Sequence, residues 1–381
     1  MPDIQMRFHK DMLVLSAPLD TLLARQGIDA ARDRQYLNLM EPDSISDALK
    51  LEAAAGAQCV VAATEDITQA RLAHLDMDAD VSRLAAAALA AAQEARPQHL
   101  LVEIGPCGLP LDAASKASLN ENRAQYADAA RAFESGDFDA FFLNGFTRIA
   151  DLKCALMGVA QVSDKPVFAS VTIGASEATA ADAGGAADAG GAADAGAAGA
   201  GGAVNARPGG GPKPTAGAHN EHTASEQGGG SENALPTFFP DGYAALDTPA
   251  APPLPAAKRT VLDPALWPEA IDAMADLGAS VIGFETPDSI QKAVEYARTA
   301  IERTALPVLA QLRVTQPPSS SARSKLVPLD AIDEYTPDTM ATSAVKLFGA
   351  GVQLLRATGL ATPAYTGALA ATVKGLDVHR E

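Results

Sequence analysis

The chain contains little cysteine. Its 381 residues include three, Cys59, Cys107 and Cys154, which lie far apart and show none of the close spacings of a structural zinc site. This argues against a fold held together by disulfides. We expect the three thiols to be packed in the core or in loops of a protein from a reducing cytoplasm.

The chain is also poor in positive charge and has no long apolar run. Lys and Arg number 29 against 47 Asp and Glu, which gives a formal net charge of −18. Such a chain is not expected to bind nucleic acid or an anionic membrane surface. Without a stretch of about 18 apolar residues we expect no membrane-spanning helix. The start, M-P-D-I-Q-M-R-F-H-K-D, lacks a basic region followed by an apolar core, so we expect no secretory signal and a cytoplasmic protein.

Residues 174–258 differ in composition from the rest of the chain. They contain near-repeats of A-A-D-A-G-G, a G-G-G-S and a proline-rich exit. Such a segment cannot bury enough apolar surface to offset chain entropy, so we expect a disordered insert. Within it, the aromatic island Thr237–Leu246 is expected to dock locally, and residues 316–324 form a second short flexible stretch. His219 and His222 have metal-like spacing, but we interpret them as incidental polar residues of the insert.

Outside these stretches, about 290 residues alternate short apolar runs with amphipathic helical patterns. We expect strands at Met12–Ala17, Gln58–Ala63, Leu100–Ile104, Ala140–Leu143, Val167–Ile173, Ser280–Phe284, Val308–Leu312 and Val352–Leu355. We expect helices at Ser44–Ala55, Ala79–Ala95, Asn120–Ser135, Arg148–Val159, Leu266–Leu277, Pro287–Arg303 and Pro337–Gly349. Glycines after helices are expected to provide left-handed C-caps at Gly56, Gly136, Gly278 and Gly351.

Eight βα units favour an α/β fold with a single (β/α)8 TIM barrel. Residues 1–173 would supply strands one to five, and residues 259–381 strands six to eight. The long insert then follows strand five. An open doubly wound sheet is the alternative that the same pattern allows.

Six segments occur in an order that is typical of one enzyme family. They are L-V-L-S-A-P-L-D-T-L-L at the first strand, Leu37–Glu65, I-G-P at Ile104–Pro106, G-D-F-D-A-F-F-L-N-G at the fourth strand, L-G-A-S-V-I-G-F-E-T-P at the sixth, and Tyr335–Leu376 at the last. Together they resemble the homocysteine S-methyltransferase family, the barrel enzymes with a homocysteine-binding domain.

The resemblance implies a zinc site that this sequence does not reproduce. In the family, three cysteine thiolates hold zinc, which activates the homocysteine thiol. The matching positions here are Thr286, Thr358 and Gly359, and the family's closing G-G-C-C-G-T reads R-A-T-G-L-A from Arg356 to Ala361. We therefore expect no zinc site of the family type, and we predict no other metal or cofactor.

Polar residues at the strand ends should meet at the C-terminal mouth of the barrel. The candidate ligand-binding residues are Asp20, Glu65, Asn144, Glu285, Thr286, Arg313, Arg356 and Thr358. Their catalytic roles are unknown. Two interpretations stay open. Glu285 either forms an ion pair with Arg356 or Arg313 in place of the metal, or joins one of them in binding a small amino-acid-like or thiol ligand.

The resemblance and the departures from it lead to three hypotheses of function. The first is a divergent methyltransferase of one-carbon and methionine metabolism with an altered substrate. The second is a catalytically silent paralogue that binds a ligand or regulates a partner methyltransferase. The third is a barrel or doubly wound protein of unrelated activity. We expect the insert either to tether a protein partner or to be a loop expansion without a role.

Overall fold

The computed structural model describes residues 3–8, 10–174, 261–315, 335–374 and 376. The compact unit formed by Met1–Gly184 and Thr260–Glu381 contains every element discussed below, and a second unit, Gly185–Arg259, lies outside the described residues. The expectations for the disordered insert, the aromatic island, residues 316–324, His219 and His222 also lie outside them.

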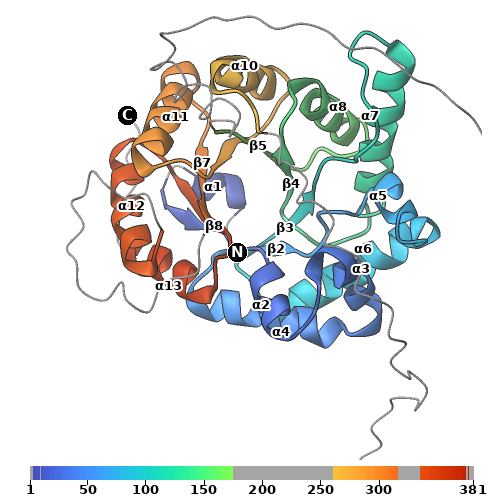
Figure 1. Cartoon of the computed structure of the whole chain (residues 1–381), viewed down its shortest axis with the longest axis horizontal. Helices are drawn as coiled ribbons and strands as arrows, with labels where there is room; N and C mark the ends of the chain where they lie inside the picture. The colour runs from blue at the N-terminus through green and yellow to red at the C-terminus, as the bar shows by residue number, and fades with distance from the viewer. Residues whose placement is uncertain (1–2, 9, 175–260, 316–334, 375, 377–381) are drawn as a thin grey trace, which may run out of the picture. The chain divides into compact units, whose positions relative to one another are not determined.

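Eight parallel strands form one sheet, in the order β1-β8-β7-β6-β5-β4-β3-β2. The strands are β1 Leu13–Val14, β2 Cys59–Ala62, β3 His99–Ile104, β4 Ala140–Phe146, β5 Val167–Thr172, β6 Val281–Thr286, β7 Val308–Val314 and β8 Leu354–Gly359. A parallel bridge between Leu15 and Cys59 joins the two ends of this order, and Ser16 N–H donates to the Cys59 carbonyl at 2.9 Å. The predicted TIM barrel is confirmed, and the open doubly wound sheet is not what the chain forms (Figure 1).

Helices connect the strands and surround them (Figure 1). They are α1 Ile4–Arg7, α2 Asp20–Arg25, α3 Ala30–Met40, α4 Pro42–Ala55, α5 Gln69–Ala73, η1 Asp78–Asp80, α6 Val81–Glu94, α7 Lys116–Arg131, α8 Ile149–Ala160, η2 Pro264–Leu266, α10 Trp267–Asp276, α11 Ile290–Arg303, α12 Pro337–Gly349 and α13 Pro363–Val373. All seven predicted helices are present. The remaining α-helices are the short α1, α2 and α5 and the longer α3, which were not predicted, and α13, the second helix of the closing segment Tyr335–Leu376. Within the described residues, no helix combines the length and apolar character needed to cross a bilayer.

Three of the four glycines expected at helix C-caps have positive φ: Gly56 at 112°, Gly278 at 82° and Gly351 at 94°. Gly136 does not, so that expectation was wrong. A Cβ atom at Gly136 would lie 2.4 Å from Leu89 Cδ1, so a side chain there would require Leu89 to move.

The lower part of the barrel interior is apolar. We call its members the barrel-floor cluster: Ile4, Phe8, Leu13, Leu15, Cys59, Val61, Leu101, Ala140, Phe142, Phe168, Val281, Leu309 and Leu354. Alternate residues of each strand point inward, while the others pack against the helices in a second, larger cluster. The N-terminal segment closes this end of the barrel because Ile4 and Phe8 belong to the cluster, and the Phe8 and Phe168 ring centroids lie 5.6 Å apart.

The strand ends differ from the predicted bounds in a way that matters for the site. The strands β4, β6 and β8 each run past the predicted end, so that Asn144, Glu285, Arg356 and Thr358 are strand residues rather than loop residues. Parallel pairing continues through Glu285, Arg356 and Thr358, whereas the pairing of β4 with β5 is irregular between Leu143 and Phe146. The inward alternation therefore decides which of these side chains face the barrel interior.

Candidate functional site

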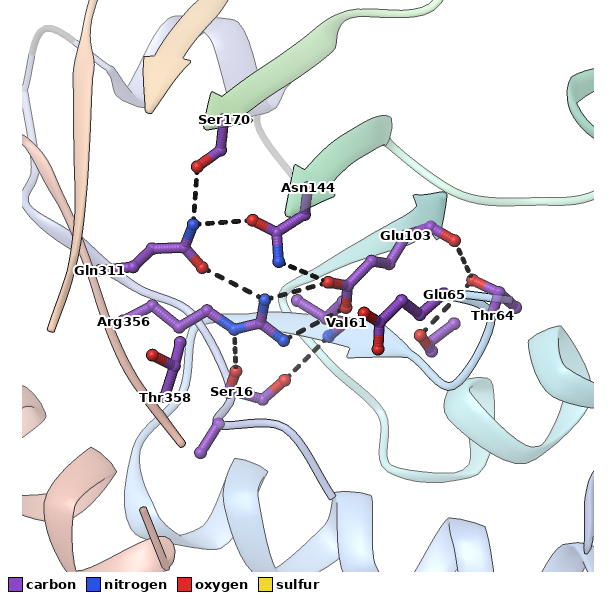
Figure 2. A network of polar contacts seen from close by, with 12 residues as sticks. Ser16, Val61, Thr64, Glu65, Glu103, Asn144, Ser170, Gln311, Arg356 and Thr358 are labelled. Carbon is purple, nitrogen blue, oxygen red and sulfur yellow. Dashed lines mark hydrogen bonds and ion pairs between the residues drawn. The ribbon is translucent and has the colours of Figure 1, made fainter. Parts of the chain in front are cut away.

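A buried arginine occupies the centre of the barrel above the floor cluster. Arg356 is 2% exposed, and its Nε donates to the Ser16 carbonyl at 2.9 Å. Its Nη1 and Nη2 donate to the two carboxylate oxygens of Glu103, each at 3.3 Å, and Nη1 also donates to Gln311 Oε1 at 3.3 Å (Figure 2). The guanidinium group lies over the Phe142 ring, 5.3 Å from its centroid. The polar layer thus rests directly on the barrel floor.

Two amides and a hydroxyl complete this central network. Asn144 Nδ2 donates to Glu103 Oε1 at 2.7 Å, and Gln311 Nε2 donates to Asn144 Oδ1 and to Ser170 Oγ, both at 2.8 Å (Figure 2). Gly283 on the neighbouring strand leaves room for them, since a Cβ atom there would lie 3.0 Å from the Ser170 Cβ. A buried polar network of this kind is stable only when its members are paired, and these are.

Burial governs the acidity of Glu103. It raises the pKa of this carboxyl group, and the attraction of Arg356 offsets that effect only in part. The negative charge of Glu65, which lies beside Glu103 in Figure 2, raises the pKa further. Glu103 and Arg356 are therefore a mutually dependent pair, because neither charge is stable at this depth without the other.

A second polar layer lies above the first, around Glu285. Its carboxylate accepts from Arg313 Nη2 at 2.6 Å, from Thr358 Oγ1 at 2.6 Å and from Thr172 Oγ1 at 3.1 Å. The four side chains come from β5, β6, β7 and β8, and the group is buried apart from part of Arg313. Of the two ion pairs considered from the sequence, Glu285 forms the one with Arg313. Arg356 pairs with Glu103 instead, because it sits one inward position deeper on its strand.

A third group of charges lies at the rim, on the side of β1 and β2. Arg34 of α3 donates to Asp20 Oδ1 at 2.5 Å and to Glu65 Oε2 at 2.8 Å. Although burial opposes it, these carboxylates raise the pKa of Arg34 above its ordinary value. Burial likewise works against ionisation of Glu65, but Arg34 lowers the pKa of this carboxyl group overall. The rim is therefore a charged bridge between the segments that follow β1 and β2.

The structure separates the eight candidate residues into these three places. Asn144 and Arg356 belong to the central network; Glu285, Arg313 and Thr358 form the second layer; Asp20 and Glu65 lie at the rim. Thr286 stands apart, since adjacent strand residues point to opposite faces. Its Oγ1 accepts from the Asp288 N–H at 3.1 Å and so supports the turn after β6.

Sequence reasoning missed the partners of these residues. The missed set is Ser16, Arg34, Glu52, Glu103, Ser170, Thr172 and Gln311. Four of them, Glu103, Ser170, Thr172 and Gln311, are polar residues inside otherwise apolar strand runs, at every second position. That is a detectable signal, because a polar residue at an inward position of a barrel strand needs a partner inside the barrel.

The three cysteines lie away from the mouth or are engaged elsewhere. Cys59 belongs to the barrel floor, where burial raises the pKa of its thiol to about 12. The Cys107 thiol donates to Asn122 Oδ1 at 3.2 Å, and Cys154 is buried on α8. Among the residues that the structure describes, no group of three His, Cys, Asp or Glu side chains is placed to hold a metal ion.

The end of β8 also restricts which side chains could stand at the position of a zinc-binding cysteine of the family. Gly359 has a φ of 68°, which disfavours any side chain. A Cβ atom there would lie 2.4 Å from the Val314 carbonyl oxygen and 2.9 Å from Arg313 Cγ. The backbone at this position therefore has no room for a metal-binding side chain while Arg313 keeps its place.

A buried carboxylate outside the barrel holds the end of β1 in position. Glu52 of α4 accepts from the Ala17 N–H at 2.9 Å and from Thr366 Oγ1 at 2.6 Å. The carbonyl of the same peptide unit, that of Ser16, accepts from Arg356. One peptide group is thus fixed from both sides, by Glu52 and by the central network.

Replacing Glu52 by glutamine is expected to change how stability depends on pH. Burial raises the pKa of Glu52 in the native state, so its contribution to stability is present below its ordinary value of 4.5 and is lost as the pH rises through the raised value. The free energy of unfolding of Glu52→Gln, relative to the parent chain, should therefore increase between pH 4 and pH 8 in urea titrations.

Glu94 provides the control for this comparison. It is exposed on α6, and its hydrogen bond from Lys50 lowers its pKa, so Glu94→Gln should show a change with pH of the opposite sign. A relative stability of Glu52→Gln that is constant with pH, or that falls as the pH rises, contradicts this assignment.

Comparisons with known proteins found one matching family model and several structures of similar fold. A family model described as homocysteine S-methyltransferase matches residues 13–199. Crystal structures of the homocysteine methyltransferase MmuM from Escherichia coli, in the metallated and oxidized forms, are similar to this chain, with TM-scores of 0.59 and 0.60. The sequence identity is 13% in both comparisons, and each covers 95% of this chain and 96% of the MmuM chain. No curated protein sequence matches the chain. At this identity the structural likeness shows a shared fold.

Proposed function

We propose that this chain, which belongs to the homocysteine S-methyltransferase family, has a barrel mouth that does not bind zinc and does not methylate homocysteine through a zinc-bound thiolate. The cluster of Glu285, Arg313 and Thr358 is the observation that supports the proposal most strongly. A divalent cation needs negatively charged ligands. The carboxylate of this layer, Glu285, is already paired with the positively charged guanidinium group of Arg313.

The chemistry of the available donors supports the same proposal. The positions that resemble the family's zinc ligands carry Thr286, Thr358 and Gly359. Neutral hydroxyl groups are poor zinc ligands, and Thr286 points away from the barrel interior. The Thr358 hydroxyl is already bonded to Glu285, and Gly359 has no space for a side chain. The residues of this mouth therefore do not fit a family-type zinc ion.

A methylation assay tests the proposal directly. The purified chain is incubated with homocysteine and, in separate reactions, a methylated sulfur compound, a methylated folate and a methylated corrinoid. We expect no formation of methionine above background with any donor, and no change on adding zinc or a chelator. Turnover that a zinc chelator abolishes would refute the proposal.

A second candidate function is the binding of a small amino-acid-like ligand at the same layer. Arg313 is partly exposed and Glu285 lies 2.6 Å from it, so the two offer one group for a carboxylate and one for an ammonium. Such a chain would act as a ligand-binding or regulatory paralogue, or as a methyltransferase with an altered substrate.

Thermal shifts separate this candidate from a mouth that is simply closed. Amino acids, thiols, folates and corrinoids are added one at a time, because a ligand specific to the native state raises the melting temperature. A shift caused by an amino acid should disappear in Arg313→Gln and persist in Arg303→Gln, whose guanidinium group pairs with Asp272 on the outer surface. Equal loss in both variants, or no shift with any compound, contradicts the candidate.

A further inference from the structure

Unpaired buried polar atoms gather at one place in the structure. In the described part of the chain, seven buried side-chain atoms have no hydrogen-bond partner, and five of them belong to Arg34, Gln35, Asn38 and Thr68. Gln35 is 2% exposed and neither its Oε1 nor its Nε2 is paired. Burying a polar group without a hydrogen-bond partner lowers the stability of the native state. This region therefore has fewer of its buried polar groups hydrogen-bonded than the central network.

Three of the four residues lie on α3, which reaches the C-terminal end of β2. Asn38 Nδ2 donates to the carbonyl of Ala63, the residue directly after β2, at 3.0 Å. Arg34 of the same helix bonds Asp20 and Glu65 at the rim. The fourth residue, Thr68, stands at the start of α5, in the segment that follows Glu65. Arg34 and Asn38, which carry two of the unpaired atoms, therefore lie where α3 meets the loop after β2, next to the mouth.

Few of the α3 side chains that the structure describes, those from Asp33 to Met40, are both apolar and buried. Within the helix, Leu37 is the residue of the described core, with Leu39 packed against it. Tyr36 and Met40 are exposed at 40% and 76%. Much of what α3 buries is polar, namely Gln35 and Asn38. Elements with few buried apolar contacts open at low free energy, independently of the rest of the fold.

The connections of α3 permit such an opening. Gly27, between α2 and α3, has a φ of 81°, and nothing lies within 4 Å of the position of a Cβ atom there. At the other end, α3 finishes at Met40 and a new helix begins at Pro42, whose ring cannot continue a helix from the preceding turn. The helix is thus bounded by a turn that contains glycine and by a break in the helical hydrogen bonding before Pro42.

We propose that α3 is a movable cover at the rim of the barrel mouth, beside the segments that follow β1 and β2, that it is closed by the ion pairs of Arg34 with Asp20 and Glu65, and that it opens to admit a small polar ligand. The ligand offers both hydrogen-bond donors and acceptors, because Gln35 lacks partners of both kinds. The proposal rests on the proposed function only in placing the ligand at the mouth.

Hydrogen–deuterium exchange of the full-length chain tests the cover without ligand or metal. The amides of α3 should exchange at least about tenfold faster than those of α4 and α6, because they open without global unfolding. Amides of α3 that exchange only with global unfolding, at the rate of α4, would overturn the proposal. A zinc-binding mouth would not alter this result, so the two proposals can fail separately.

Two variants probe the closure from opposite directions. Arg34→Gln removes both ion pairs and should raise the exchange rate of the α3 amides about a further tenfold. The control Arg83→Gln loses only an exposed ion pair with Asp80 and should leave the exchange rate of α3 unchanged. Gln35→Leu replaces the unpaired amide by an apolar group of similar size and should slow the exchange of α3 several-fold. Faster exchange in Gln35→Leu would mean that fixed water satisfies the amide, and it would contradict a cover that opens for a ligand.

Discussion

Replacing Arg356 by methionine is expected to lower the free energy of unfolding by about 3–5 kcal/mol, because breaking one side of a buried ion pair leaves the other charge unpaired. The charge left behind is that of Glu103, which is buried beneath the mouth and has no other cationic partner among the bonds of the central network. Methionine has a similar length, so the loss reports the missing charge and hydrogen bonds more than a cavity. Urea unfolding at pH 7 measures the change.

Two further variants separate this effect from a general loss of packing. Arg303→Met removes an arginine from the exposed pair with Asp272 and should leave the free energy of unfolding nearly unchanged. In the double variant Arg356→Met with Glu103→Gln, no unpaired charge remains, so part of the lost stability should return. A loss below about 1 kcal/mol for Arg356→Met alone would mean that the central network does not support the barrel.

Replacing Phe8 by alanine is expected to cost about 3–5 kcal/mol, the usual range for removing a buried aromatic side chain. Phe8 belongs to the barrel-floor cluster and packs edge-on against Phe168, so its loss would open the lower end of the barrel to water. Chemical unfolding monitored by circular dichroism provides the measurement.

Met6 serves as the control, since it lies on the short helix α1, which ends directly before Phe8, and is 61% exposed. Met6→Ala should change the free energy of unfolding by no more than about 0.5 kcal/mol. If Phe8→Ala and Met6→Ala have equal and small effects, the N-terminal segment does not close the barrel in solution.

The fold could be predicted from the sequence because its main signal is local. All eight strands lie within or next to the apolar runs that predicted them, and all seven expected helices are present. Short strands buried on both faces and amphipathic return helices have strong patterns. The helix α3 was missed because its polar residues, among them Arg34, Gln35 and Asn38, give it little amphipathic character. The same property underlies the proposed cover.

The site could be predicted only in part, because its chemistry depends on register. Residue type and position at strand ends were enough to select Glu285, Arg313, Arg356 and Thr358. The sequence could not tell which arginine would pair with Glu285. In the sheet, Arg356 is opposite Gln311 and Thr358 is opposite Arg313, which places Arg313 and Thr358 one inward step above Arg356. A shift of one residue in register would turn these side chains from the barrel interior to the helix side and remove the contacts.

The pairing of Arg356 with Glu103 was beyond sequence reasoning for a related reason. The two residues lie 253 positions apart and come from β8 and β3, which are not neighbours in the sheet. Their contact exists because the barrel closes and both side chains point to its axis. No pattern within either strand specifies a partner across the interior.

The metal content of the purified full-length chain tests the central claim most directly. The chain is expressed with added zinc, freed from loosely bound ions by buffer exchange, and analysed by elemental mass spectrometry. With Thr286, Thr358 and Gly359 in place of thiolates and Arg313 bonded to Glu285, we expect far less than one zinc ion per chain. One zinc ion per chain, retained through buffer exchange and lost in Glu285→Gln, would contradict the claim that this barrel mouth does not bind zinc.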